Sequence, residues 1–473
     1  MRTTRHRCSP PLPRRPSPSR WHVYLLRCRD GSLYTGITND LDKRLKAHAA
    51  GKASRYTRSR LPVTLAYSEP QKSKSAALKR EAAIKRLQKC GKERLLAGSK
   101  SRTINNNQNQ PTKTHNPMKL TDYTKTHLPI YEVSLDEPPE TRWHDVAAEE
   151  HKNIAAILRD TVKESAQHAD RLPSWLRPSA ILGGKGLARL GGWITNSVAD
   201  MFGGEYAAEI RSIAATTNQS LGYVTLGNLI YDLTQIGGHW GVGCSSFSCD
   251  IEGMPTLVRN MDWVTPRSTG KHTRLIKFCR GKEHYLSVSV LGCVGVVSAM
   301  CPGKWAVTIN QAPMNGTKPG YLQWPVLQRL RACCDKMGTY EELVADLQTY
   351  QTMTSFFAHV IGTKPGQHTV ITGTGKTFWE REPDAACLLQ TNHFVGEDLE
   401  HHNPPEEWEQ DGTVWFNDTF RRLRSLQRRL PEPPKTLSGA RKEILGGPVT
   451  TTDTMQQMVF QPATGAWRVW VRR

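Results

Sequence analysis

The sequence predicts an α+β protein in which a small αβ domain is followed by an αββα sandwich. The 473 residues are too many for one hydrophobic core, so two or more domains are expected. A polar stretch rich in Asn and Gln, residues 99–117, separates two parts of different composition. Beyond this stretch, helical patterns come first and strand-like runs follow, as expected when helices cover a strand-rich body.

These changes in composition divide the chain into five segments. Residues 1–20 are basic and rich in proline, which disfavours a helix, so we expect a disordered basic arm there. The other segments are a compact αβ domain at 21–98, a linker at 99–117, a helical region at 118–243 and a strand-rich body at 244–473.

In the small domain, short apolar runs alternate with turn signals. The runs WHVYLLRC and SLYTGI are separated by RDG, which predicts a strand hairpin. A helix is expected to begin after Asn39 or Asp40, since either side chain can cap it. A strand at VTLAYSE and a long basic helix follow, and Ala77, Ile84 and Leu87 lie near one face of that helix.

The part beyond the linker changes from helical to strand-like near Gly243. The segment LPIYEVSLDEPPETRW is expected to be extended, with a break at its prolines. One helix is expected over 149–167 and two helices around a turn over 203–233. Further helices are expected at 325–350 and 418–430. The expected strands are SSFSCD, TLVRNMDW, RLIKFCR, YLSVSVLGCVGVVSAM, WAVTIN, HTVITGTG, KTFWERE and ACLLQTNHF.

Positive charge is confined to the beginning of the chain. Residues 1–117 contain 27 Lys and Arg but 6 Asp and Glu, a net charge of +21. The remainder contains 37 residues of each sign and is neutral overall. This asymmetry predicts a nucleic-acid partner, DNA, for residues 1–117. The alternative is a solvated basic face without a partner.

Several classes of protein are disfavoured by the composition. The eleven cysteines form no CxxC pair, which argues against a zinc ribbon and a dense disulfide framework. No apolar run is long enough to cross a membrane. The basic arm lacks the apolar stretch of a secretory signal, so a cytoplasmic protein is expected, although an organelle transit peptide stays open.

Residues 21–98 resemble the GIY-YIG nuclease superfamily, and most closely its small stand-alone bacterial members. The two family motifs are present as His22-Val23-Tyr24 and Tyr34-Thr35-Gly36. His22 replaces the first glycine of the family pattern. The other matching positions, in family order, are Arg44, His48 and Glu81.

The resemblance implies a metal-dependent DNA endonuclease. Tyr24 and Tyr34 would orient or deprotonate the attacking water, with His48 supporting that step. Arg44 would hold the scissile phosphate. Glu81, the lone acid of its basic helix, would bind Mg²⁺ or another divalent cation, unless it is simply an ion-pair partner of a lysine four residues later. DNA backbone contacts are expected from Lys79, Arg80, Lys85, Arg86 and Lys89.

The second resemblance covers residue 128 to the C-terminus. It is to acid ceramidase and the related acylethanolamine-hydrolysing amidase, within the choloylglycine-hydrolase type of N-terminal nucleophile enzymes. It is carried by PIYEVSLDEPPETRW, by GNLIYDL followed by GCSSFSCDIEGMPTLVRNMDW, and by LLQTNHF. The implied fold is the αββα sandwich of these hydrolases.

This resemblance implies a cysteine amidohydrolase without a cofactor, activated by self-cleavage before Cys244. The freed amine of Cys244 would act as the base for its own thiol, and Asp262 would orient that amine. Arg259 would stabilise the thiolate, and Asn392 would donate to the oxyanion. A further basic position falls on Arg422 or Arg421, with Arg422 favoured. The expected substrate is an N-acyl amide lipid or a similar small amide, cut at an optimum nearer neutral pH.

Two other interpretations remain open at this stage. The large module could be an inactive scaffold, with cleavage or binding of nucleic acid as the only activity. The fusion could also join two adjacent reading frames, with Met118 as a true start. A third pattern is set aside: GTGKT at 373–377 lacks the earlier glycine of a phosphate-binding loop, where Val370 stands instead.

Overall fold

In the computed structural model the chain forms two compact units, one within residues 1–110 and one formed by the described residues from 123 on. Each unit is considered by itself. The described residues are 21–30, 32–71, 73–86, 123–124, 128–167, 204–236, 242–263, 267–312, 320, 323–375, 377–396, 399–403, 418–451 and 453–472. The predicted linker, Met118 and Leu87 lie outside them.

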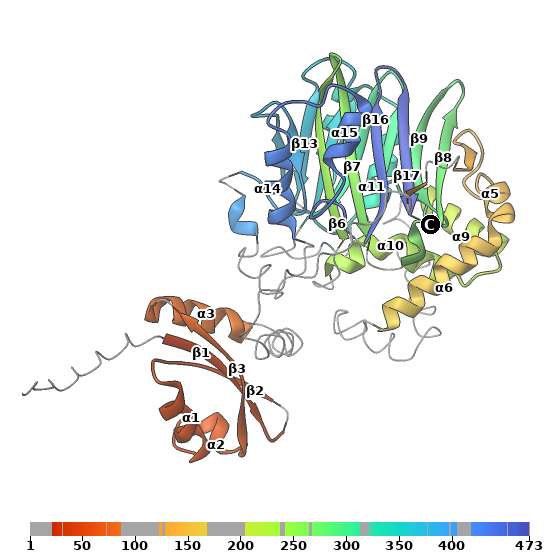
Figure 1. Ribbon diagram of the computed structural model, residues 1–473. Coiled ribbons are helices and arrows are strands. Elements are labelled where there is room, and N and C mark those ends of the chain that lie inside the picture. Colours follow the sequence, from red (N-terminus) through yellow and green to blue (C-terminus); the bar gives the residue numbers. More distant parts are fainter. Residues whose placement is uncertain are drawn as a thin grey trace, which may run out of the picture. The chain divides into compact units, whose positions relative to one another are not determined.

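The small unit is a three-stranded antiparallel sheet with helices (Figure 1). The strand order is β2-β1-β3, and the predicted hairpin is the β1–β2 pair. Its elements are β1 (Trp21–Cys28), β2 (Leu33–Thr38), α1 (Leu41–Ala49), α2 (Arg55–Arg58), β3 (Val63–Gln71) and α3 (Lys74–Arg86).

The two faces of β1 have different roles because side chains alternate along a strand. Val23 and Leu25 form a core with Ala77 and Ile84 of α3. Tyr24, between them, points to the other face of the sheet and is also fully buried. Of the two expected caps of α1, Asp40 holds that position, and its carboxylate accepts from the backbone N–H of Lys43. The sheet therefore buries its hydrophobic core with one set of side chains and positions polar aromatic groups with the other.

The large unit contains two mostly antiparallel sheets. One has the order β14-β13-β12-β11-β10-β9-β8-β5, and the other has the order β15-β6-β7-β16-β17-β4. The strands of the first are β5 (Ile130–Ser134), β8 (Thr273–Arg280), β9 (Glu283–Val290), β10 (Ser298–Cys301), β11 (Trp305–Gln311), β12 (Phe356–Ile361), β13 (His368–Gly373) and β14 (Phe378–Arg381). Those of the second are β4 (Tyr123–Thr124), β6 (Val242–Ile251), β7 (Met254–Trp263), β15 (Leu388–Gln390), β16 (Thr454–Gln461) and β17 (Ala466–Arg472).

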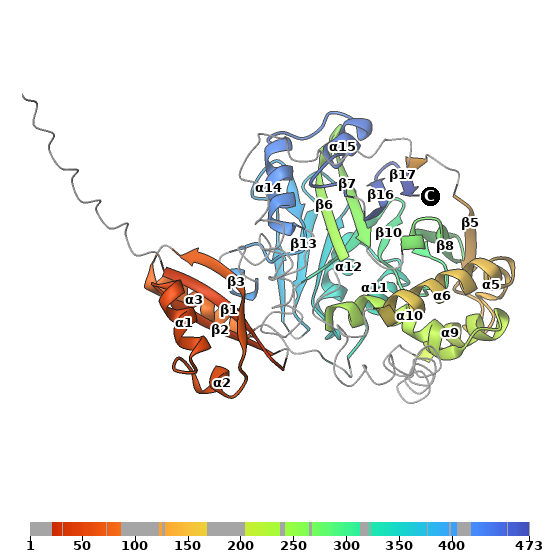
Figure 2. The same ribbon diagram turned by 60° about the horizontal axis from the view of Figure 1, so that its bottom comes forward.

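Helices cover both outer faces of this pair of sheets (Figures 1 and 2). Helices α14 and α15 pack on the six-stranded sheet, and α12 packs on the eight-stranded sheet. Strands β6 and β7 face β11 and β12 across the middle. The unit is thus the expected αββα sandwich. Its helices are α5 (His144–Glu149), α6 (His151–Gln167), α9 (Gly204–Thr216), α10 (Leu221–Ile236), α11 (Val326–Cys334), α12 (Tyr340–Leu347), α14 (Thr419–Arg429) and α15 (Leu437–Glu443).

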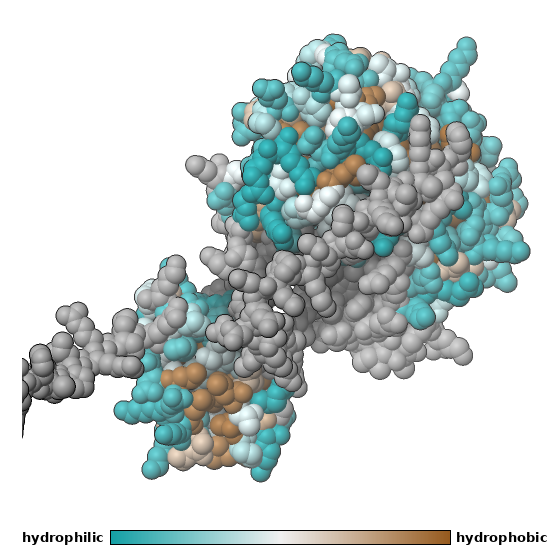
Figure 3. Space-filling model, viewed as in Figure 1, coloured by the Kyte–Doolittle hydropathy of each residue, from teal (hydrophilic) through white to brown (hydrophobic). Residues whose placement is uncertain are grey.

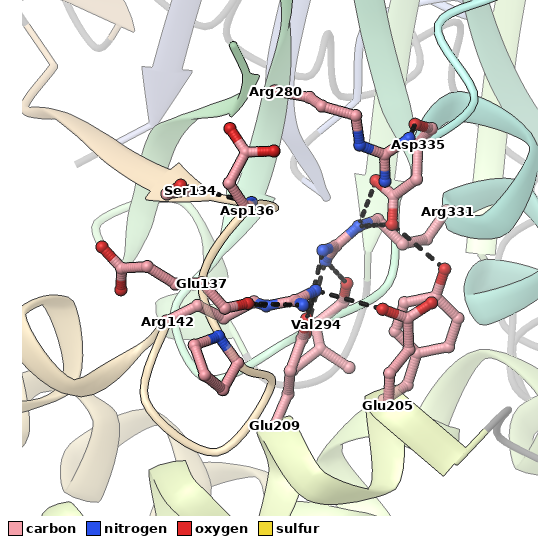
Figure 4. Close-up of polar contacts among 12 residues, drawn as sticks. Ser134, Asp136, Glu137, Arg142, Glu205, Glu209, Arg280, Val294, Arg331 and Asp335 are labelled. Atoms are coloured by element: carbon pink, nitrogen blue, oxygen red, sulfur yellow. Dashed lines mark hydrogen bonds and ion pairs between the residues drawn. The ribbon is translucent and has the colours of Figure 1, made fainter.

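A buried network of charges joins the helices that precede residue 243 to the strand body (Figure 4). Arg331 on α11 is fully buried and pairs with Glu209 of α9 at 3.2 Å and with Asp335 at 2.7 Å. Arg142 donates to the same Glu209 at 3.0 Å. Because a buried charge is tolerated only when it is paired, these ion pairs determine how α9 packs against the rest of the unit.

Several elements differ from the sequence-based expectation. The strand expected over 285–300 is divided into β9 and β10 by a turn in which Gly292 has a φ of 81°. Strands β12, β16 and β17 were not anticipated, although β12 and β17 are predominantly apolar runs. No described helix is long and apolar enough to cross a membrane.

The surface is mostly hydrophilic in the view of Figure 1, with one hydrophobic patch on the small unit (Figure 3). The large hydrophobic side chains that this unit exposes, among its described residues, are Tyr56, Leu65 and Leu78. Tyr56 is 40% exposed, and the guanidinium of Arg60 lies 4.2 Å from its ring centroid. An exposed aromatic beside a cation suits contact with a nucleobase.

Candidate active sites

The small unit gathers four of its five expected site residues on one face of the sheet. The Tyr24 hydroxyl lies 2.9 Å from Nε2 of His48 and accepts from Nε of Arg44 at 3.1 Å. The ring of Tyr34 lies 6.5 Å from that of Tyr24 and 5.1 Å from that of His48. Gly36 makes this packing possible, because a Cβ there would lie 2.7 Å from the Tyr24 hydroxyl oxygen.

The hydrogen bonds of Thr57 set the tautomer of His48. The Thr57 hydroxyl donates to the carbonyl of Ser54 and lies 2.9 Å from Nδ1 of His48. A hydroxyl that already donates must accept from Nδ1–H, which leaves Nε2 free to accept the proton of Tyr24. Burial and then the charge of Arg44 lower the pKa of His48, so its ring is neutral near pH 7. Burial raises the pKa of Tyr24, so its phenol is the proton donor of the pair.

Glu81 lies on α3 and pairs with Lys85 at 2.8 Å. Its charge also acts on Tyr24, as one of the smaller causes of the raised pKa of that phenol. The geometry shows the ion pair with Lys85, and the assignment of Glu81 as a cation ligand stays a prediction. The geometry does not support the expected phosphate contact from Arg80, because its guanidinium is mostly buried and bonds Glu69 at 2.6 Å.

In the large unit, Cys244 and Arg259 come together on the β6–β7 hairpin. The two strands pair from Val242 to Ile251, and both side chains are almost completely buried. Nη2 of Arg259 donates to Sγ of Cys244 at 3.2 Å. Arg259 also donates to Ser298 and to the carbonyls of Ile309 and Val297, which hold the guanidinium in place. The fixed guanidinium therefore keeps a hydrogen-bond donor aimed at the Cys244 sulfur.

Asn392 and Arg422 surround the backbone of Cys244. Oδ1 of Asn392 accepts from the Cys244 N–H at 2.6 Å and from Nη2 of Arg422 at 2.8 Å. Nη1 of Arg422 also donates to the carbonyl oxygen of Cys244. One hydrogen of the Asn392 amide bonds the carbonyl of Gln311 at 2.8 Å. The neighbouring Arg421 points elsewhere, with 68% of its side chain exposed.

Asp262 lies directly across from Gly243 in the β6–β7 ladder. Burial raises its pKa to about 7, while the charge of Arg422 and a hydrogen bond from Thr454 lower it in part. Within the described part of the chain, Oδ1 accepts from Thr454 and Oδ2 has no hydrogen-bond partner. A buried carboxyl with one oxygen that lacks a hydrogen bond among the described residues thus lies on the strand beside Gly243.

An apolar cavity of about 50 Å³ is lined by residues next to two of these site residues rather than by the site residues themselves. Trp263, which follows Asp262, lines it, and so does Val297, whose carbonyl accepts from Arg259. Its other walls come from both sides of residue 243: Ile157, Leu158 and Ile230 before it, and Leu291 and Leu327 after it.

Comparison with known proteins decides the family of the small unit. The GIY-YIG catalytic domain family matches residues 20–94. A UPF0213 protein of Streptococcus sanguinis is 52% identical over 84 residues, which are 18% of this chain and 93% of that protein. The chain belongs to the GIY-YIG family. Since GIY-YIG is a nuclease domain, the chain contains a hydrolase, and the domain implies binding of DNA.

Two solved structures of hydrolases are also similar to parts of the chain. The N-acylethanolamine-hydrolyzing acid amidase orthologue of Caenorhabditis elegans is 18% identical, covers 48% of this chain and 99% of its own, and has a TM-score of 0.39. A mutant of the conjugated bile acid hydrolase from Clostridium perfringens is 8% identical, covers 48% and 88%, and has a TM-score of 0.33.

The GIY-YIG unit offers a cation few protein ligands. Among the described residues no group of three or more His, Cys, Asp or Glu converges on a point. Glu81 is the carboxylate whose charge reaches Tyr24, and one carboxylate fits a hydrated Mg²⁺, which keeps most of its water ligands. The donor set thus fits a cation held by Glu81 and water.

Three polar residues of the two sites were not anticipated from the sequence. Thr57 of the GIY-YIG unit lies in the run RYTR, which carries no local signal for a bond to His48. Gln311 and Thr454 approach Asn392 and Asp262 from strands far along the chain. Only the fold brings them to the site, so a motif search on one sequence could not find them.

Proposed function

We propose that the large unit is a cysteine amidohydrolase that cuts its own chain between Gly243 and Cys244 and then hydrolyses N-acyl amides. The observation that carries the proposal is the 3.2 Å contact between the Cys244 thiol and the buried, fixed guanidinium of Arg259. A buried cysteine that served only packing would not need a buried cation, which is costly to desolvate.

Self-cleavage would involve the carboxyl across from Gly243. Because its pKa is about 7, Asp262 is partly protonated near neutral pH and would give the proton that the leaving nitrogen takes, while the Cys244 thiol releases its own proton to water. Sγ then bonds to the Gly243 carbonyl carbon, and the C–N bond to Cys244 breaks as its nitrogen takes a proton. Water hydrolyses the thioester, which releases the Gly243 carboxylate and restores the thiol.

The freed amine of Cys244 would then work as the base in amide hydrolysis. An α-amine titrates near pH 8 in the absence of neighbours, so it can take the thiol proton and pass it to the leaving amine. Asp262 would hold that amine with its unpaired oxygen. Asn392 would give the second hydrogen of its amide to the oxyanion, and the apolar cavity would hold a short acyl group or the first part of a longer one.

The test is the intact mass of the purified chain together with an assay on N-acyl amides. The parent should appear as pieces 1–243 and 244–473 and should release a fatty acid from an N-acylethanolamine. Cys244→Ala should remain one chain without activity, whereas Cys301→Ala, which removes another buried thiol, should behave as the parent. An uncut and inactive parent would favour an inactive scaffold, and activity in Cys244→Ala would exclude this mechanism.

For the GIY-YIG unit we propose metal-dependent cleavage of DNA. Neutral His48 would accept the proton of Tyr24, which in turn takes a proton from the attacking water. Arg44 would hold the phosphate beside this pair, and exposed Tyr56 would stack on a base. A cation on Glu81 would supply charge stabilisation at the phosphate. Cutting of a labelled duplex by the full chain, with Mg²⁺ or with chelator, tests the proposal.

A further inference from the structure

A pair of thiols lies on the reverse side of the nucleophile strand. Side chains alternate along β6, so Cys244, Ser246 and Ser248 face one way and Cys249 faces the other. Cys249 belongs to a core with Phe247 and with residues of α14 and α15. This thiol is therefore separate from the site around Cys244.

The partner thiol comes from the neighbouring strand. Leu388 of β15 pairs with Ser248 of β6 in antiparallel register, which places the preceding Cys387 opposite Cys249. Cys387 belongs to the same core, and both thiols are free and almost completely buried. The two thiols are near enough to shift each other's pKa in opposite directions. Two cysteines, far apart in sequence, therefore meet side by side.

The backbone geometry suits a covalent link. Directly opposite residues of an antiparallel pair have Cα atoms about 4.5–5.5 Å apart. Disulfides span Cα distances of about 4.4–6.8 Å, so the register brings the pair within the range of a bond without moving either strand. By contrast, the adjacent Cys333 and Cys334 lie on one helix, where the side chains diverge.

We propose that Cys249 and Cys387 are a redox pair whose oxidation ties β15 to β6. The oxidant is a small disulfide of the glutathione type. The Cys387 thiolate attacks one oxidant sulfur and releases the other half as a thiolate. The Cys249 thiol, losing its proton, then displaces the second half, so the protein loses two electrons and two protons and the oxidant becomes two thiols.

The order of attack follows from the effect of each thiol on the other. The interaction with Cys249 lowers the pKa of Cys387, and the interaction with Cys387 raises the pKa of Cys249. The thiolate is the reactive form, so Cys387 is the attacking residue. It also lies beside β15, the outermost strand of the six-stranded sheet, where local opening gives an oxidant access.

The link would act on the segment that supplies Asn392. β15 has three residues, and two residues after it the chain reaches Asn392, which contacts Cys244. A bond from Cys387 to β6 would anchor this short segment at its start. Oxidation would therefore hold Asn392 near Cys244. In the reduced protein, β15 would separate from β6 more often.

The test exposes the reduced, folded chain to oxidised glutathione, blocks free thiols with N-ethylmaleimide and maps the digested peptides by mass spectrometry. The expected product is a linked peptide pair containing Cys249 and Cys387, lighter by two hydrogens and separated by dithiothreitol. Cys387→Ser should abolish the link, and Cys333 and Cys334 should remain blocked as free thiols. The same mapping on Cys244→Ala removes any contribution from the nucleophile.

A second measurement separates a functional link from an incidental one. Amide exchange over residues 388–392 should slow by about tenfold or more after oxidation, and should not change in Cys249→Ser. Failure to form the link, both in the folded chain and on refolding from urea in glutathione buffer, would overturn the proposal. A link that leaves this exchange unchanged would refute the anchoring of β15. Neither result depends on amidase activity.

Discussion

Asp262 allows a quantitative test, because the carboxyl assigned to the proposed self-cleavage should destabilise the uncut chain. The perturbation is Asp262→Asn in the Cys244→Ala background, which stays in one piece. Burial raises the pKa of Asp262 from 3.8 to about 7, and the charges that face it are Arg422, Asp453 and Arg259. Since asparagine cannot ionise, it resembles the protonated acid at every pH.

The magnitude follows from the shift in pKa. Below pH 3.8 the carboxyl is protonated in both the folded and the unfolded chain, and it carries no penalty. As the pH rises toward 7, only the unfolded chain loses the proton, so the folded state loses stability by about 1.4 kcal/mol for each pH unit. The Asp262→Asn change should therefore stabilise the chain by about 2 kcal/mol at pH 5 and about 4 kcal/mol at pH 8.

Urea unfolding followed by tryptophan fluorescence measures this difference. Of the 13 tryptophans, Trp21 lies in the small unit and the others lie beyond residue 117, so the signal reports mainly the large unit. Asp145→Asn, an exposed control on α5, should change stability by less than about 0.5 kcal/mol at either pH. If Asp262→Asn raised the free energy of unfolding equally at pH 5 and pH 8, ionisation would not be the cause. If it lowered that free energy at pH 8, the Asp262 carboxylate would have a compensating partner. With Cys244 restored, the same Asp262→Asn change should prevent both self-cleavage and amide hydrolysis.

Four other outcomes are expected. Glu81→Ala should abolish Mg²⁺-dependent cutting in a gel assay but retain salt-sensitive DNA binding, whereas Lys85→Ala should still cut. Thr57→Val should lower the cutting rate by about tenfold and change the His48 tautomer seen by ¹⁵N NMR, with Thr57→Ser restoring both. Asn392→Ala should lower the amidase turnover by about 10²–10³-fold, measured at saturating substrate. Arg331→Met should lower the free energy of unfolding by about 3–5 kcal/mol in a urea titration, because Glu209 is left buried without a full set of partners.

The sequence predicted most of the fold where periodicity and turns are strong. The β1–β2 hairpin, the two helices before Gly243 and the β6–β7 hairpin follow from local patterns. Strand β12 was missed because its run FFAHVI has no alternation of polar and apolar residues: every residue is buried. A strand buried on both faces cannot be distinguished by period from a short buried helix. Strands β16 and β17 were missed for a different reason, because glutamine and arginine interrupt their apolar runs.

The candidate sites were predictable to the extent that family motifs mark them. Arg259 was assigned from the resemblance to the amidohydrolases, and the register of the hairpin explains its contact with Cys244. The sequence alone could not identify the residues that form hydrogen bonds with the predicted site residues. Thr57 lies 9 residues after His48, and Thr454 lies 192 residues after Asp262. Nothing in the sequence around either threonine indicates these contacts.

The position of the proposed cut explains how one broken bond could activate the large unit without dismantling it. Cleavage before Cys244 would remove only the first two residues of β6 from its ladder, and Cys244 to Ile251 would still pair with β7. The released piece would remain attached through the charges that Arg331 shares with Glu209, which lie on opposite sides of the cut. The cavity has walls from both pieces as well, so the acyl group could bind only while they stay together. Loss of the Arg331 pair should therefore weaken substrate binding in the cut protein, even though Arg331 does not line the cavity.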